Sequence, residues 1–219
     1  MKAFCIILRG HPYSEMAGMR CIRAATDIGG IEVHRFDATP RDDALSEMAK
    51  HGLQWTWGTD NVLKHHPYGG PLETRVGCAM SHYRLWLDCA AQEETFLILE
   101  HDSVFIRAMP EIEFDGICQV NDPLGATHRG SWWAEQMEGR AGGAYPKTPV
   151  RTDPRVPDGL AGNSAYLIKP WAARKLVNKC HEVGLWPNDA IMCIQFFPFL
   201  QEYYPFITRV EQTMSTTST

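Results

Sequence analysis

Blocks of apolar residues recur along the chain, and the pattern within four of them predicts β-strands. Continuous apolar runs at 4–8, 95–99 and 164–168 are typical of strands that are buried on both faces. Residues 31–36 instead alternate between apolar and polar side chains, which also predicts a strand. The segments between these strands have a different periodicity.

Helical patterns lie between the predicted strands. Apolar residues recur at helical spacing over 75–92, which predicts a helix that packs on the sheet. The helix-forming segments 14–28 and 171–183 each end at glycine, a common helix stop. Residues 41–74 show no such pattern and are expected to be irregular. This alternation favours an α/β fold with a mostly parallel sheet flanked by helices.

No linker or internal repeat divides the chain, and 219 residues are within the range of one domain. We therefore expect a single domain over residues 1–214. Within it, the glycine- and proline-rich segment 115–158 is expected to be a long loop excursion. Its tryptophans, Trp132 and Trp133, would form local core or a platform for a sugar ring. The segment 215–219 is expected to be a flexible tail.

Composition limits the classes of partner. The formal net charge of −5 provides no basic field, so nucleic acid is not an expected partner. The N-terminal apolar run is too short for a signal peptide, and no stretch is long enough to span a membrane. The 7 cysteines are scattered without a CxxC pair, which favours reduced thiols and a cytoplasmic protein.

The strongest chemical signal follows the strand at 95–99, where Glu100 and Asp102 flank His101. Acids at the carboxyl end of a buried strand lie in the crevice where open α/β sheets bind ligands. Two carboxylates there would suit Mg²⁺ or Mn²⁺, and such an ion would suit a diphosphate. The same three residues would also make an ordinary polar turn, and the residues alone leave both interpretations open.

Several motifs in order along the chain resemble glycosyltransferase family 25, which includes lipooligosaccharide and collagen galactosyltransferases. The main one is Arg-Val-Gly-Cys-Ala-Met-Ser-His at 75–82, followed by Trp86 and by Leu-Ile-Leu-Glu-His-Asp at 97–102. Phe-Asp-Ala at 36–38, Ala-Tyr-Leu-Ile at 165–168 and Pro-Asn-Asp at 187–189 also agree in order and approximate spacing. The similarity covers most of residues 4–192, apart from 115–158.

The resemblance implies a GT-A-like transferase of the lipopolysaccharide biosynthesis type. Such an enzyme would move a hexose, galactose or glucose, from a UDP-sugar to the hydroxyl of a glycan or other acceptor, with inversion. Glu100 and Asp102 would hold Mn²⁺ or Mg²⁺. Asp189 would be the general base, or else the N-cap of a short helix. Donor contacts are expected from six residues: Arg9, Asp37, Arg75, Ser81, His82 and His101.

Two positions depart from the family pattern. The family usually carries aspartate at the position of His101 and glutamate at the position of Arg75. The two outer acids are retained, so an ion could still be held, but a charge is inverted where the donor phosphates would lie. The alternative function is therefore a catalytically inactive protein that binds nucleotide sugars. A metal-dependent hydrolase is a less favoured hypothesis, because the sequence has no second cluster of metal ligands with recognisable spacing.

Overall fold

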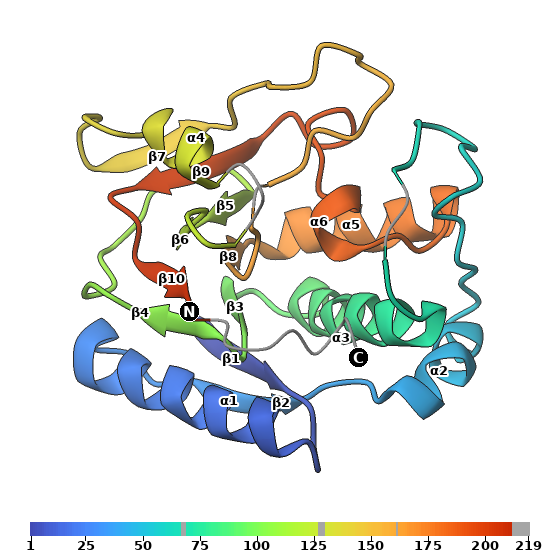
Figure 1. The fold of residues 1–219 in the computed structure, drawn as a ribbon, viewed down its shortest axis with the longest axis horizontal. Helices are drawn as coiled ribbons and strands as arrows, with labels where there is room; N and C mark the ends of the chain where they lie inside the picture. Colours follow the sequence, from blue (N-terminus) through green and yellow to red (C-terminus); the bar gives the residue numbers. More distant parts are fainter. Residues whose placement is uncertain (67–68, 127–129, 161, 212–219) are drawn as a thin grey trace.

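The computed structural model describes residues 1–66, 69–126, 130–160 and 162–211. Within these residues, a seven-stranded sheet has the order β2-β1-β3-β8-β5-β9-β7, and a smaller sheet has the order β4-β10-β6 (Figure 1). The strands are β1 (Lys2–Ile7), β2 (His34–Asp37), β3 (Phe96–Glu100), β4 (Ser103–Phe105), β5 (Ile117–Gln119), β6 (Asn121–Asp122), β7 (Gly143–Pro146), β8 (Ala165–Ile168), β9 (Leu200–Tyr204) and β10 (Thr208–Val210).

The central sheet is mixed but largely parallel. β2, β1 and β3 are parallel neighbours, and β5 is parallel to β9. The exceptions are β8, which is antiparallel to both β3 and β5, and β7, which is antiparallel to β9. The predicted α/β class is therefore confirmed, with two reversed strands that the apolar runs alone did not reveal.

The helices are α1 (Pro12–Ala24), α2 (Ala44–Lys50), α3 (Leu72–Ala90), α4 (Gly130–Glu135), α5 (Pro170–Val183) and α6 (Asn188–Ile191). α1 begins where His11 Nδ1 accepts a hydrogen bond from the Ser14 amide, and it runs on into a π-helical turn that ends at Gly30, whose φ is +69°. The prediction that 41–74 is irregular was wrong for α2, because seven residues are too few for a clear helical period. No described helix is long and apolar enough to cross a membrane.

Side chains on both faces of the sheet are buried, which explains the continuous apolar run at β3. Phe96 and Ile98 contribute to the core cluster formed with α3 and α5, which pack side by side (Figure 1). Leu97 and Leu99 contribute to the opposite cluster, with residues of α1 and β4. Successive side chains of a strand point to opposite faces, so a strand covered on both sides must be apolar throughout.

The predicted loop excursion at 115–158 contains regular structure and supplies two strands, β5 and β7, to the central sheet. Its strands are only two to four residues long, and each pairs with a segment distant in sequence, so local periodicity could not identify them. β9 and β10 were likewise not predicted. The expected flexible tail at 215–219 lies outside the described residues.

Candidate functional site

The two acids after β3 lie in different surroundings. Glu100 is the last residue of the strand, and its side chain is 32% exposed. Asp102 is 5% exposed, and among the described residues its Oδ1 atom has no hydrogen-bond partner. Burial, and then the charge of Glu100, raise the pKa of Asp102 to about 7. A cation at this carboxylate would offset both its burial and its repulsion by Glu100.

A chain of buried hydrogen bonds holds Glu100. Its Oε1 atom lies 3.2 Å from Nε2 of His82, whose Nδ1 atom lies 2.9 Å from the Tyr166 hydroxyl. Trp86 Nε1 donates to that same hydroxyl at 2.8 Å. Because a carboxylate only accepts, His82 donates from Nε2 and accepts from Tyr166 at Nδ1. His82 is 1% exposed, so this chain orients Glu100 from inside the core.

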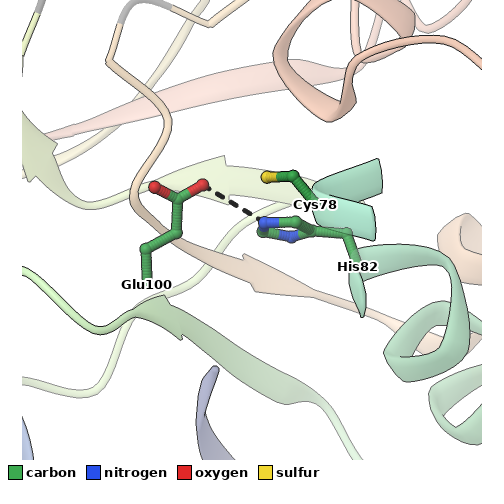
Figure 2. Close-up of side chains that lie close together, drawn as sticks. All are labelled: Cys78, His82 and Glu100. Carbon is green, nitrogen blue, oxygen red and sulfur yellow. Dashed lines mark hydrogen bonds and ion pairs between the residues drawn. The ribbon is translucent and has the colours of Figure 1, made fainter. Parts of the chain in front are cut away.

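Cys78 lies one helical turn before His82 on α3. One ligand atom from each of Cys78, His82 and Glu100 lies within 4.8 Å of the others. Figure 2 shows the sulfur and the imidazole ring directed toward the carboxylate. Burial raises the pKa of the Cys78 thiol. Cys78 was not predicted as a site residue, although its i, i+4 spacing from His82 on a predicted helix was a usable signal.

The first of three adjoining cavities, the histidine cavity, has a volume of about 250 Å³. Its polar lining includes His11, His82, Glu100 and His101, so two of the predicted donor-binding histidines meet here. The His101 ring lies edge-on to Tyr13 at 6.0 Å between centroids, and burial lowers the pKa of His101. His101 is therefore mainly uncharged at neutral pH.

Ser81 also lines the histidine cavity, but its hydroxyl is engaged with the backbone. Ser81 Oγ accepts from the Thr39 amide at 2.9 Å and donates to the Gly77 carbonyl at 2.7 Å. A Cβ at Gly77 would lie 2.8 Å from the Thr39 carbonyl oxygen, so glycine is needed for this close approach. Gly77 and Ser81 thus hold the segment after β2 against α3 and shape the cavity wall.

The second cavity, the carboxylate cavity, has a volume of about 270 Å³ and shares Cys78 and Glu100 with the histidine cavity. Asp102, Arg75 and Asp189 also line it, so four predicted site residues gather here. One terminal nitrogen of the Arg75 guanidinium, Nη2, donates to the Gly70 carbonyl at 2.9 Å.

The third cavity, the tryptophan cavity, has a volume of about 400 Å³ and shares Gly162 and Asp189 with the carboxylate cavity. Trp57, Trp133 and Arg151 line it. Asp158 also lines it and forms a buried ion pair with Lys147 at 3.2 Å. The Lys147 ammonium lies 4.1 Å from the centroid of the Trp133 ring. Burial lowers the pKa of Lys147.

Asp189, like Gly162, lines both of the last two cavities. It is the second residue of α6, and the N-cap of that helix is Pro187. The alternative prediction, that Asp189 is the N-cap, is therefore wrong. Gly159 has no room for a Cβ, because the Asp189 carbonyl oxygen occupies that position. This contact sets α6 against the segment that carries Asp158 and Gly159.

Two predicted donor-binding residues lie elsewhere. Arg9, whose side chain is 78% exposed, pairs with Asp37 at 3.4 Å, and Arg35 pairs with the same carboxylate at 2.7 Å. Neither Arg9 nor Asp37 lines any of the three cavities. Asp37 ends an edge strand, where nearby arginines neutralise its carboxylate.

Comparison with known proteins agrees with the motifs. Residues 22–116 match the sequence model of glycosyltransferase family 25 (LPS biosynthesis protein). No curated protein sequence matches the chain. Among solved structures, the galactosyltransferase LgtC in complex with donor and acceptor sugar analogs is 13% identical and has a TM-score of 0.40, with 92% of this chain and 73% of that chain covered. An active-site mutant of LgtC gives 14% identity, a TM-score of 0.41, and coverage of 92% and 72%.

The matched segment contains α3 and β3, and hence Cys78, His82, Glu100 and Asp102, which line the histidine and carboxylate cavities. Asp189 and the tryptophan cavity lie beyond its end. Residues 22–116, which carry α3 and β3, therefore match glycosyltransferase family 25.

Proposed function

We propose that this protein transfers a hexose, galactose or glucose, from a UDP-sugar to an acceptor hydroxyl with inversion, using Mn²⁺ or Mg²⁺. The observation that carries the proposal is the series of three adjoining cavities. Glu100 and Cys78 lie between the first two, and Asp189 lies between the last two. Such a series can accommodate a nucleotide, a diphosphate-linked sugar and an acceptor in the order that transfer requires.

In this assignment the nucleoside occupies the histidine cavity. His11 and His101 offer ring nitrogens and flat faces there, and the remaining lining includes apolar residues such as Ile6 and Leu8. The diphosphate and the sugar then lie in the carboxylate cavity, near Arg75. The guanidinium would neutralise part of the phosphate charge.

Glu100 and Asp102 would hold the divalent ion. They fit it because Asp102 presents a buried oxygen without a partner and because hard carboxylate oxygens are what Mn²⁺ and Mg²⁺ prefer. When bound, the ion neutralises the charge that develops on the leaving diphosphate. His82 fixes the direction of the Glu100 carboxylate through its 3.2 Å hydrogen bond.

Asp189 would act as the general base. Its position between the carboxylate and tryptophan cavities is where an acceptor hydroxyl would meet the donor sugar. The acceptor oxygen attacks the anomeric carbon, the bond from that carbon to the diphosphate oxygen breaks, and the acceptor proton passes to the Asp189 carboxylate. A single displacement of this kind inverts the anomeric centre.

The acceptor would lie in the tryptophan cavity. Indole rings such as Trp57 and Trp133 present large apolar faces to sugar rings, and Arg151 offers hydrogen-bond donors beside them. This location makes a glycan the favoured class of acceptor.

A second candidate is a protein that binds nucleotide sugars without transferring them. Arg75 favours this binding-only hypothesis, because it introduces a positive charge into the carboxylate cavity where the family usually has an acid. Arg75 could then replace part of the metal's role in holding the diphosphate.

Release of UDP separates the two candidates. The protein would be incubated with a panel of UDP-sugars and glycan acceptors, with Mn²⁺ or with excess EDTA, beside the variant Asp189→Asn. Asp88→Asn, a change at an exposed acid on α3, is the matched control. Metal-dependent release that is lost only in Asp189→Asn supports transfer. Binding of UDP-sugar without release by any of the proteins supports the second candidate.

A further inference from the structure

Cys78, His82 and Glu100 bring a sulfur, a nitrogen and an oxygen ligand together at the boundary of two cavities. The three ligand atoms lie within 4.8 Å of one another, and the nitrogen–oxygen distance is 3.2 Å. Two ligands of a tetrahedral zinc ion, with bonds of about 2.0–2.1 Å, are separated by about 3.3 Å. The imidazole and carboxylate are thus already spaced for a shared ion, and Figure 2 shows the sulfur directed toward the same carboxylate.

We propose that Cys78, His82 and Glu100 form a Zn²⁺ site distinct from the oxygen-ligand site at Glu100 and Asp102. Thiolate and imidazole are ligands that Zn²⁺ accepts readily, whereas Mg²⁺ prefers oxygen ligands. Three protein ligands leave a fourth position for water. Cys78 is half-buried and lines both the histidine and carboxylate cavities, so an ion can approach it from either side.

Binding of Zn²⁺ requires a rearrangement of protons that the surrounding groups can accommodate. The Cys78 thiol proton is released to solvent, and the sulfur binds as thiolate. The His82 hydrogen moves to Nδ1, which frees Nε2 for the ion. Tyr166 then turns its own O–H away from Nδ1 and accepts hydrogen bonds from both His82 and Trp86, since a hydroxyl oxygen has two acceptor positions.

The two metal sites would compete because both need the Glu100 carboxylate. Zn²⁺ bound to Cys78 and His82 would turn that carboxylate away from Asp102 and would fill the boundary between the histidine and carboxylate cavities. The consequence, which rests on the proposed function, is that Zn²⁺ inhibits the Mn²⁺-supported enzyme. Binding of Zn²⁺ itself does not depend on any transfer activity.

Spectroscopy with Co²⁺ in place of Zn²⁺ tests the site directly. We expect the intact protein to show the near-ultraviolet sulfur-to-cobalt charge-transfer band and the visible bands of tetrahedral Co²⁺, and Zn²⁺ to displace both. Cys78→Ser should remove the charge-transfer band and weaken Zn²⁺ binding by at least about 100-fold, since even indirect partners of a metal contribute 10–100-fold. Cys180→Ala, which removes a buried thiol on α5, should change neither.

A cobalt spectrum without the charge-transfer band, or one that Cys78→Ser leaves intact, would overturn the proposal. Circular dichroism and melting temperature of Cys78→Ser, measured beside the intact protein, establish that the variant is folded. His82→Gln is the second variant, and it should remove the tetrahedral bands while the thiol remains.

Competition is measured separately, as Mn²⁺-dependent binding of UDP at increasing Zn²⁺ concentration. We expect Zn²⁺ to abolish this binding in the intact protein. The Zn²⁺ concentration that halves it, judged against each protein's own UDP binding without Zn²⁺, should rise by at least about 100-fold in Cys78→Ser. Equal UDP binding with and without saturating Zn²⁺ would contradict the shared ligand. A protein that never binds UDP with Mn²⁺ would overturn the proposed function, while the cobalt result would still decide the zinc site.

Discussion

The carboxylate cavity and the tryptophan cavity meet at Asp189, yet they are constructed differently. Most of the acidic and basic groups of the first come from α3 and from the end of β3, two regular elements that lie within residues 72–102. The second is lined mainly by segments outside the longer helices and strands, and it depends on the buried pair of Lys147 and Asp158 beneath it.

Under the proposed function, this difference would separate chemistry from recognition. Long regular elements would hold the groups placed toward a diphosphate, whereas loops and the short helix α4 would carry the residues that contact an acceptor. Changes in the carboxylate cavity should therefore affect metal and donor, and changes around the tryptophan cavity should affect acceptor and local stability. Four predictions test this division.

Asp189 joins the two cavities, so its replacement should have the largest effect on turnover. Asp189→Asn retains the shape of the side chain but removes its basicity, and the transfer rate should fall by about 10²–10⁴-fold. UDP-sugar affinity and melting temperature should change little. Transfer kinetics and thermal melts of Asp189→Asn and the control Asp88→Asn measure this. A fully active Asp189→Asn protein would exclude Asp189 as the general base.

Removal of the buried carboxylate beneath the tryptophan cavity should destabilise the protein. Asp158 is 2% exposed and accepts from Lys147 and from the amides of Val150 and Arg151. Asp158→Ala removes the ion-pair partner of the buried Lys147, which keeps its hydrogen bond to the Thr148 carbonyl and the nearby charge of Glu202. The free energy of unfolding should fall by about 3 kcal/mol. Chemical denaturation of the variant and of the intact protein measures this loss of unfolding free energy.

Asp153→Ala is the matched control for that loss. Asp153 pairs with Arg155 and Lys64 at the surface of the same segment, where solvent screens the charges. Its replacement should leave the denaturation midpoint almost unchanged. Equal losses in the two variants would mean that burial of the Lys147–Asp158 pair is not what stabilises this region.

Asp102 should make stability depend on pH when no metal is present. Its pKa rises from 3.8 to about 7 on folding, so the protonated acid is favoured in the native state. Its contribution is therefore fully present below about pH 4 and is lost as the pH rises through about 7, at a cost on the order of 2–4 kcal/mol. Denaturation between pH 4 and 8 should show this slope in the intact protein and a flatter one in Asp102→Asn.

Addition of Mn²⁺ tests whether Asp102 is the group that lowers stability at high pH. The ion should restore stability at pH 8 in the intact protein but not in Asp102→Asn, since a ligand that binds only the native state stabilises it. The same stabilisation of both proteins would place the ion away from Asp102.

Tyr166→Phe should have the smallest effect of the four, confined to the carboxylate cavity. It removes the hydroxyl that fixes His82 and, through it, Glu100. Mn²⁺-dependent UDP affinity should fall by about 10-fold, as for other residues that orient a metal ligand indirectly. Tyr83→Phe is the control, because Tyr83, which is buried on α3, likewise pairs through its hydroxyl with a histidine, His181, at 3.0 Å. Equal loss of affinity in both variants would show a general effect of packing.

Local sequence patterns were sufficient to predict the part of the site that is carried by β3 and α3. The apolar run before Glu100 and the helical spacing through His82 identified β3 and α3, because burial of a strand or a helix face requires a short-range periodicity. The acids at the strand end and the motif on the helix follow from those two elements. Metal, donor and base roles for these residues remain predictions.

The direction of β8 and the grouping of distant residues in one cavity could be seen only in the tertiary structure. The apolar run of β8 does not encode its antiparallel direction, which depends on its pairing with β3 and β5. Trp57, Trp133 and Asp189 come from segments far apart in sequence, and they line one cavity where the Asp189 carbonyl approaches Gly159 closely. Contacts between distant segments depend on packing that no local period records.

Sequence patterns alone were therefore sufficient to predict the fold class, the strand that ends in two acids and the helix beside it. The tertiary structure decided that Cys78 joins His82 at Glu100, that Arg9 and Asp37 pair with each other outside the cavities, and that Asp189 connects two of them. The two differ in the sequence separation of the residues involved. Periodicity within one helix or strand indicates which of its faces is buried, whereas a functional site is formed where several such elements meet.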